Sequence, residues 1–303
     1  MTIQHIVITG GGPTGFVSYG VIKRLYEAKI WTYENIKSIY GSSIGALVAV
    51  IISLGIDWET IDDYIIKRPW EKAFVNIGFD SIDIITLFLN KGLDGKKMIS
   101  IILEPLLKLI ELPIDVTLKC FSEKTGIDLH LIATDLNGSS TLIEVDLCAD
   151  KTPDIILCDA VAASLAIPVM FQPVIYKSSC LLDGGILNNY PLNMCLKNID
   201  DENSVIGIRN EWSTENLDVS SESSYFELLR IFIRKLHNSV DSTIKNHTIK
   251  YEIICDVDGL SNMEKWLDTI ESSNIRNELI NNGIDIANKF ISEKFTEMTQ
   301  ETV

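Results

Sequence analysis

The residue best placed by sequence to do chemistry is Ser43, which stands where a short apolar run turns into an apolar helix. Residues 36–54 read IKSIYGSSIGALVAVIISL, and Gly41, Ser43 and Gly45 form a G-x-S-x-G pattern inside them. Between a strand and a helix this pattern is typical of a nucleophile elbow, a turn so tight that its flanking residues need almost no side chain. The free N–H groups at the start of the helix favour an anion near the hydroxyl. We therefore predict that Ser43 is a nucleophile, against the simpler interpretation of an ordinary glycine and serine turn.

A serine nucleophile needs a base, and Asp183 is the first candidate. It ends a predicted hairpin of residues 171–176 and 180–182 and is followed by Gly184 and Gly185. Two glycines let the backbone approach the carboxylate closely, and burial under an apolar substrate makes a carboxylate a stronger base. Asp183 can therefore take the proton of Ser43 in a two-residue device. The simpler interpretation of this segment is an Asx turn.

Histidine is the other candidate base, and the chain has four. His5 precedes a glycine loop and His130 lies inside a predicted strand, where a buried structural role is expected. His237 and His247 remain, and the order serine, aspartate, histidine matches the triad of α/β-hydrolases. A Ser-Asp dyad and a Ser-Asp-His triad both stay open at this point.

A glycine loop follows the first predicted strand, residues 5–9, and precedes a predicted helix at residues 16–28. Gly10, Gly11 and Gly12 can turn several N–H groups toward one negatively charged group. Gly10, Gly12 and Gly15 also satisfy the dinucleotide fingerprint, and Glu34 lies near the position of a ribose-binding acid. The loop therefore fits either a pyrophosphate or the oxyanion of an acyl intermediate, although a proline at position 13 offers no N–H.

Taken together, four motifs in this order resemble the patatin-like phospholipases. They are the glycine loop at residues 10–15, G-x-S-x-G at 41–45, residues 163–174 with the pattern ASxAxPxxFxPV, and residues 183–191 with the pattern DGGxxNNxP. The motifs extend over roughly two thirds of the chain. No one motif is specific, whereas the ordered set is. The resemblance implies a three-layer α/β fold with a central, mainly parallel sheet between helices, and a C-terminal helical extension beyond it.

The same resemblance implies an activity and its residues. It implies hydrolysis of fatty-acyl esters in phospholipids or other lipids by a Ser43 and Asp183 dyad, with no cofactor, no catalytic metal and no triad histidine. It places an oxyanion site at Gly10, Gly11 and Gly12. The supporting glycines of the motifs are Gly15, Gly41, Gly45, Gly184 and Gly185. Thr14 departs from the family, which commonly has arginine or lysine there, and this leaves activity on anionic head groups in doubt.

Composition narrows the partners. The chain has 303 residues, 46% hydrophobic and 22% charged, with a net charge of −16. This charge disfavours nucleic acid and anionic surfaces. The first residues lack the features of a secretory leader, and residues 44–56, the longest apolar stretch, are too short to span a membrane. The six cysteines have no metal-binding spacing and are expected to be reduced. We expect a cytoplasmic protein that visits membranes or micelles for its lipid substrate; the sequence indicates no oligomeric state.

The organisation expected from the sequence is a catalytic domain at residues 1–210 with a helical insertion at about 57–124, and a mainly helical part at 211–303 packed on the same domain. Within these, we expect a hairpin at 127–146, a helix starting at Thr152 and Pro153, strands at 204–208 and 251–255, and a helix at 275–298. Residues 225–244 form an amphipathic pattern suited to core packing or, alternatively, to a membrane surface. A lipid-binding protein without catalysis is the remaining alternative; it would not need Ser43, Asp183 and the glycine loop together.

Overall fold

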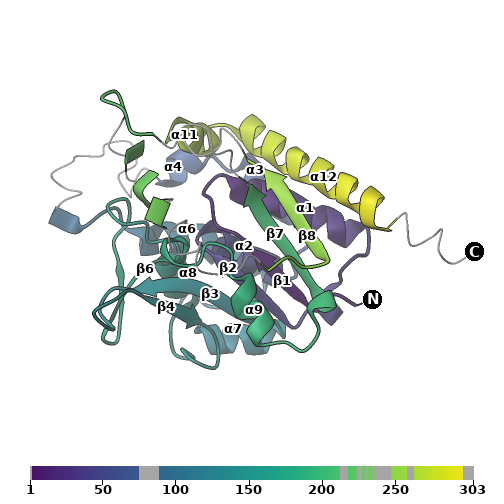
Figure 1. Cartoon of the computed structure of the whole chain (residues 1–303), viewed down its shortest axis with the longest axis horizontal. Helices are drawn as coiled ribbons and strands as arrows, with labels where there is room; N and C mark the ends of the chain where they lie inside the picture. Colours follow the sequence, from purple (N-terminus) through teal and green to yellow (C-terminus); the bar gives the residue numbers. More distant parts are fainter. Residues whose placement is uncertain are drawn as a thin grey trace, which may run out of the picture.

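The computed structural model of the chain describes residues 2–74, 89–211, 218–223, 227–228, 231–233, 235–236, 247–257 and 263–295. These residues contain one sheet of eight strands in the order β5-β6-β3-β2-β1-β7-β8, with β4 paired to β3 (Figure 1). The strands are β1 (His5–Ile8), β2 (Ser38–Ser42), β3 (Asp128–Asp135), β4 (Ile143–Leu147), β5 (Val174–Tyr176), β6 (Ser179–Asp183), β7 (Val205–Glu211) and β8 (Tyr251–Asp256). Strands β3, β2, β1, β7 and β8 run parallel, whereas β4 and β6 are antiparallel to β3, and β5 to β6.

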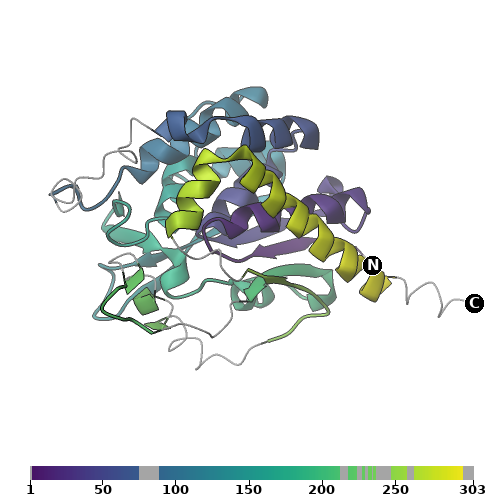
Figure 2. The ribbon, with the colours of Figure 1, turned by 90° about the horizontal axis from the view of Figure 1, so that it is seen from above.

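Helices connect and cover these strands. They are α1 (Thr14–Glu27), α2 (Ile44–Ser53), α3 (Trp58–Lys67), α4 (Trp70–Phe74), α6 (Gly95–Leu109), α7 (Leu118–Thr125), α8 (Leu157–Ser164), α9 (Leu192–Lys197), α11 (Met263–Glu271) and α12 (Ser273–Phe295). In Figure 2 the purple α1 and the yellow α12 lie together on one side of the sheet. The fold is therefore the predicted α/β arrangement of a mainly parallel sheet between helices, with a C-terminal helix.

Both faces of the central strands are buried. In β1, Ile6 and Ile8 join the large core under the helices, while Val7 belongs to a smaller core with Leu192 of α9. A parallel strand covered on both faces reads as a continuous apolar run, and the β-branched residues of β1 fit this role. The central strands thus form a rigid platform whose carboxyl ends all meet at one edge of the sheet.

One expected helix start was wrong. The helix after β4 begins at Leu157 and not at Thr152. The Thr152 hydroxyl and N–H both donate to the carbonyl of Cys148, which closes a turn back onto the end of β4. The hydroxyl is therefore not available to cap a helix. Most of residues 225–244 lie outside the described residues, so the role of that segment stays a prediction, as does the domain boundary at residue 210.

The C-terminal helix α12 packs on α1 with backbone in contact with backbone. A Cβ placed on Gly20 of α1 would lie 2.1 Å from the carbonyl oxygen of Ile280, and one on Gly283 of α12 would lie 2.1 Å from that of Val17. Any larger residue would push the helices apart. Glycine at both positions allows this close approach.

Arg276 of α12 links three helices by binding carbonyls at the ends of α3 and α11. Arg276 is 2% exposed, and its guanidinium makes five hydrogen bonds. Those to Ile66 and Arg68 bind carbonyls at the end of α3, and those to Thr269 and Ile270 bind carbonyls at the end of α11. The last carbonyls of a helix lack intrahelical partners, and a cation favours that end of the helix dipole. One side chain thus satisfies two helix ends.

We expect Arg276→Leu to lower the free energy of unfolding by about 3 kcal/mol, because it leaves the buried carbonyls without donors. Urea denaturation followed by circular dichroism measures this. The matched control is Arg24→Leu: Arg24 also links α1 to α12, through Asn288, but at the surface, so its loss should cost less than about 1 kcal/mol. Equal losses for the two variants would contradict the role given to Arg276.

Candidate active site

Ser43 occupies the sharp turn between β2 and α2. Its backbone has φ 52° and ψ −128°, a conformation that a residue other than glycine rarely adopts. A Cβ on Gly41 would lie 2.5 Å from the carbonyl oxygen of Gly45, and one on Gly45 would lie 2.5 Å from that of Ile8. The two flanking glycines are therefore required by close backbone contacts. This geometry is that of the predicted elbow.

The register of the sheet brings Asp183 to Ser43. On β3, Ile132 pairs with Ser42 of β2, and the next residue, Ala133, pairs with Asp183 of β6. Strand β4 pairs with the opposite edge of β3, so β6 arrives on the same edge that β2 has just left. Ser43 is the first residue after β2, and its hydroxyl donates to Asp183 Oδ2 at 2.7 Å.

The carboxylate of Asp183 is held by both of its oxygens. Oδ1 accepts from the N–H of Gly185 at 2.7 Å, while Oδ2 accepts from Ser43. The side chain is buried, and burial raises the pKa of Asp183 to about 7, although these two hydrogen bonds act to lower it. A carboxylate with a pKa near neutrality can both accept and return a proton.

Ser164, at the end of α8, fixes the position of the elbow. Its hydroxyl donates to the carbonyl of Ile132 at 2.6 Å and accepts from the N–H of Ser43 at 3.0 Å. The hydroxyl therefore links the strand that pairs with Asp183 to the backbone of Ser43. This residue belongs to the third sequence motif, but the motif alone gave no role for it.

The glycine loop lies beside Ser43, but its three N–H groups are not equivalent. Gly10 donates to the carbonyl of Asn189 at 3.0 Å and is not free for a substrate. Gly11 has φ 152° and Gly12 has φ 62°, both in the range that favours glycine. Neither the N–H of Gly11 nor that of Gly12 donates a hydrogen bond to any described residue. This narrows the expected oxyanion donors to Gly11 and Gly12.

Two asparagines hold the loop in place. Asn189 donates to the Gly10 carbonyl at 3.3 Å, and Asn210, at the end of β7, donates to the same carbonyl at 3.0 Å and to the Thr14 hydroxyl at 2.7 Å. Thr14 is fully buried by this contact. Thr14 is therefore a structural part of the loop and presents no charge.

The other supporting glycines allow close contacts around these groups. A Cβ on Gly15 would lie 2.5 Å from Cγ1 of Ile44, one on Gly184 would lie 2.3 Å from the carbonyl oxygen of Ile132, and one on Gly185 would lie 2.7 Å from Oδ1 of Asn189. Each of these motif positions thus faces the elbow, β3 or the loop-holding asparagine. The structure brings all of the predicted site residues to the carboxyl edge of the sheet.

The structure does not bring the alternative residues there. His247 precedes β8 and pairs with Glu202, which precedes β7, at 3.0 Å. Glu34 lies in a short turn, Tyr33–Asn35, ahead of β2. These positions are at the amino edge of the parallel strands, opposite Ser43 and the glycine loop. This arrangement removes His247 as the triad base and Glu34 as a ribose-binding acid; His237 lies outside the described residues.

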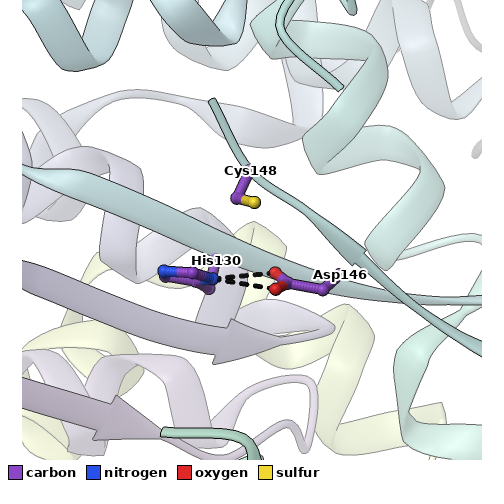
Figure 3. Close-up of side chains that lie close together, drawn as sticks. All are labelled: His130, Asp146 and Cys148. Carbon is purple, nitrogen blue, oxygen red and sulfur yellow. Dashed lines mark hydrogen bonds and ion pairs between the residues drawn. The ribbon is translucent and has the colours of Figure 1, made fainter. Parts of the chain in front are cut away.

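The most concentrated ionisable cluster surrounds His130 instead. His130, Asp146 and Cys148 form the one group of at least three His, Cys, Asp or Glu side chains in the described part of the chain that lies close enough to hold a metal ion (Figure 3). His130 Nδ1 lies 2.9 Å from Asp146 Oδ1, and Nε2 lies 3.2 Å from Asp128 Oδ2. Lys151 also pairs with Asp146, at 2.7 Å.

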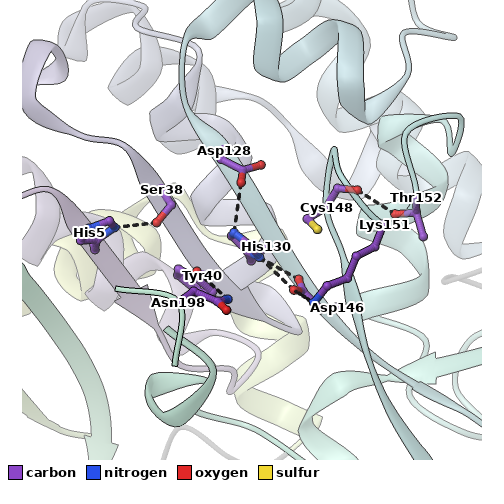
Figure 4. A network of polar contacts seen from close by, with 10 residues as sticks. All are labelled: His5, Ser38, Tyr40, Asp128, His130, Asp146, Cys148, Lys151, Thr152 and Asn198. Atoms are coloured by element: carbon purple, nitrogen blue, oxygen red, sulfur yellow. Dashed lines mark hydrogen bonds and ion pairs between the residues drawn. The ribbon is translucent and has the colours of Figure 1, made fainter. Parts of the chain in front are cut away.

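These contacts balance charge within the cluster. Burial by itself lowers the pKa of His130, but its hydrogen bonds to Asp128 and Asp146 raise that pKa well above the ordinary value. The charged ring stacks on Tyr40 with centroids 4.0 Å apart, and Tyr40 accepts from Asn198 at 3.2 Å (Figure 4). Imidazolium and ammonium groups thus offset the two carboxylates. We interpret the cluster as a structural ion network, in line with the buried role predicted for His130.

Comparison with known proteins identifies the family of the chain. The family described as patatin-like phospholipase matches residues 6–196, which include Ser43, Asp183 and the glycine loop. The chain belongs to the patatin-like phospholipase family. It is therefore a hydrolase of a lipid-acting family.

Two relatives and one solved structure illustrate what this patatin-like protein is similar to. It is 26% identical to the probable lipid hydrolase 463L of Invertebrate iridescent virus 6, over 64% of this chain and 63% of that protein. It is also 26% identical to the uncharacterized protein R571 of Acanthamoeba polyphaga mimivirus, over 71% and 68% of the two chains. The crystal structure of VipD from Legionella pneumophila has the same fold, with a TM-score of 0.57, 19% identity and coverage of 97% of this chain and 67% of that one.

Within the described residues of this patatin-like protein, no helix has the length and apolar character needed to cross a membrane. The six cysteines, all within the described ranges, are free thiols.

Sequence reasoning missed the residues that hold the site of this patatin-like protein. Ser164 and Asn189 lie in motifs that were identified, whereas Asn210 follows the predicted strand at 204–208, lies near the end of the observed β7 and belongs to no motif. A polar residue at the carboxyl end of a parallel strand is a usable signal, because that edge carries the site in open α/β sheets.

The His130 network generates a prediction about pH. Its pKa is higher in the folded than in the unfolded state, so its stabilising effect is complete below the unfolded pKa of about 6.5 and declines as the pH rises toward the folded pKa. The unfolding free energy lost in His130→Asn should therefore be larger at pH 6 than at pH 9, as measured by urea denaturation. His247→Asn, which removes only a half-exposed pair, is the control and should cost less than about 1 kcal/mol. An equal or larger loss at pH 9 would disprove the assignment.

Proposed function

We propose that this protein is a serine lipid acyl hydrolase of the phospholipase A type, which cleaves fatty-acyl esters through Ser43 and Asp183. The observation that carries the proposal is the 2.7 Å hydrogen bond from the Ser43 hydroxyl to Asp183, formed beside a loop with two free N–H groups. Nucleophile, base and oxyanion donors are the three parts that acyl transfer requires.

The reaction begins when Asp183 accepts the proton of Ser43 as the hydroxyl oxygen attacks the ester carbonyl. The N–H groups of Gly11 and Gly12 stabilise the oxyanion, each donor being worth on the order of 10² to 10³ in rate. Asp183 returns the proton to the leaving alcohol or lysolipid, and an acyl ester on Ser43 remains. Water, deprotonated by the same carboxylate, then releases the fatty acid and restores Ser43.

The charges of the chain favour a neutral or zwitterionic substrate. The net charge of −16 opposes approach to an anionic surface, and Thr14 provides no positive charge beside the glycine loop. We further propose a cytoplasmic enzyme that acts at a membrane or micelle surface, supported by the six free thiols, which suit a reducing compartment.

Incubation with a fluorophosphonate, followed by intact-mass spectrometry, tests the nucleophile. We expect one adduct on the wild type, none on Ser43→Ala, and loss of labelling by at least about 10³-fold in Asp183→Asn, because the hydroxyl then has no base. His237→Ala and His247→Ala should both label like the wild type.

The matched control is Ser53→Ala, another buried serine, whose hydroxyl only bonds to Ala49 within α2. It should keep the adduct. A folded wild type that binds lipid without forming an adduct would favour the lipid-binding alternative, and a large loss in a histidine variant would restore the triad.

Asp183 also sets an expected pH dependence. Because it acts as a base, only the ionised form is active, so kcat/KM should fall tenfold per pH unit below an apparent pKa of about 7 and level off above it. The profile is measured with a soluble p-nitrophenyl ester. Because this substrate needs no lipid interface, the measured rate does not include interfacial binding. A profile that stays flat down to pH 5 would contradict Asp183 as the base.

A further inference from the structure

Helix α11, which lies beyond all of the sequence motifs, contacts the glycine loop through Trp266. A Cβ placed on Gly12 would lie 2.4 Å from Trp266 Nε1 and 2.6 Å from its Cε2 and Cζ2 atoms. The indole therefore occupies the space that a side chain at position 12 would need. Gly12 is required both by this contact and by its φ of 62°.

The same loop touches the nucleophile two residues earlier. A Cβ on Gly10 would lie 2.9 Å from Cβ of Ser43. Because consecutive Cα atoms are 3.8 Å apart, Gly10 and Gly12 are separated by at most about 7 Å. Trp266 therefore lies beside one end of this short loop, and Cβ of Ser43 lies beside the other end.

The position of Trp266 is fixed by the packing of α11 and α12. Arg276 binds the end of α11 to the end of α3, and α12 lies against α1 through Gly20 and Gly283. Helix α1 itself starts at Thr14, directly after the glycine loop. The loop leads into α1, and α11, which carries the indole, is held by α12, the helix that packs on α1.

We propose that Trp266 is a substrate-contacting residue whose indole forms an apolar wall for the hydrocarbon chain next to the ester group. The proposal rests on the proposed function, in which the ester oxygen lies at Gly11 and Gly12. An ester bound there presents its polar oxygen to the N–H groups and must place its adjoining methylenes beside them. An indole offers a large apolar face for such a chain. The C-terminal helices thus complete a site whose reacting groups lie within residues 6–196.

The test compares short-chain and long-chain esters, p-nitrophenyl acetate and p-nitrophenyl dodecanoate. We define the chain-length ratio as kcat/KM for the dodecanoate ester divided by kcat/KM for the acetate ester. Trp266→Ala should lower this ratio by about 10-fold or more, because loss of the apolar wall weakens chain binding. Most of the change should be a higher KM for the dodecanoate ester. Trp266→Phe, which keeps an aromatic face, should stay within about threefold of the wild type. Leu267→Ala, on the same helix with a 38% exposed side chain, is the matched control and should leave the ratio unchanged.

A second readout does not depend on hydrolysis. Dodecanoate, added below its micelle concentration, should change the tryptophan emission of the wild type and of Ser43→Ala, and should change that of Trp266→Phe much less. Two results together would contradict the role of Trp266 in binding the chain: an unchanged kcat/KM ratio in Trp266→Ala, and a tryptophan emission that responds to dodecanoate alike in all variants. They would leave the proposed function intact. Emission that responds only with Trp266 present, in a wild type that fails to label with the fluorophosphonate, would support the wall and reject the proposed function.

Discussion

The site depends on one feature of the sheet, the replacement of β2 by β6 along the same edge of β3. Strand β2 pairs with β3 up to Ser42, and β6 pairs with the next residue of β3 through Asp183. A parallel strand that ends and an antiparallel strand that arrives there point their last residues at each other. The hydroxyl of Ser43 and the carboxylate of Asp183 meet for this reason, although 140 residues separate them in the chain.

The surroundings constrain the conformation of Ser43 and the ionisation of Asp183. Ser43 is held in an unfavourable backbone conformation, and such strain persists only where neighbouring contacts over-determine it. The close contacts of Gly41 and Gly45, and the hydroxyl of Ser164 bound to the Ser43 N–H, supply that constraint. Burial of Asp183 raises its pKa to about 7, which is the range that the proposed role as a base near neutral pH requires. Strain and desolvation both lower stability locally, and the rigid buried strands beneath the site tolerate that cost.

Asp183 and His130 are both buried ionisable residues of the sheet, but different causes determine their pKa values. Among the residues that the structure describes, Asp183 has hydrogen-bond donors but no cation in contact, and desolvation therefore dominates its pKa. His130 has two carboxylates in reach, and its ion pairs outweigh desolvation. A buried charge with a partner holds structure together, whereas a buried carboxyl group without a cation is available for proton transfer. This difference separates a structural histidine from a candidate base more clearly than residue type does.

The sequence by itself determined the local pieces and their order. Glycines at 41 and 45 around a serine, three glycines after a β-branched strand, and Asp183 before two glycines each specify a turn through backbone sterics, which act over a few residues. The ordered set was enough to predict the fold class and the candidate residues.

Only the tertiary structure decided which distant residues meet. Strand register placed Asp183 beside Ser43 and left His247 at the opposite edge, and it gave His130 its two carboxylates. The turn at Thr152 formed because the end of β4 supplied a carbonyl acceptor. Packing of α11 brought Trp266 to Gly12. The sequence of neither segment predicts this contact, because it depends on how α12 packs on α1. Contacts between elements depend on register and packing distance, and these are properties of the whole fold.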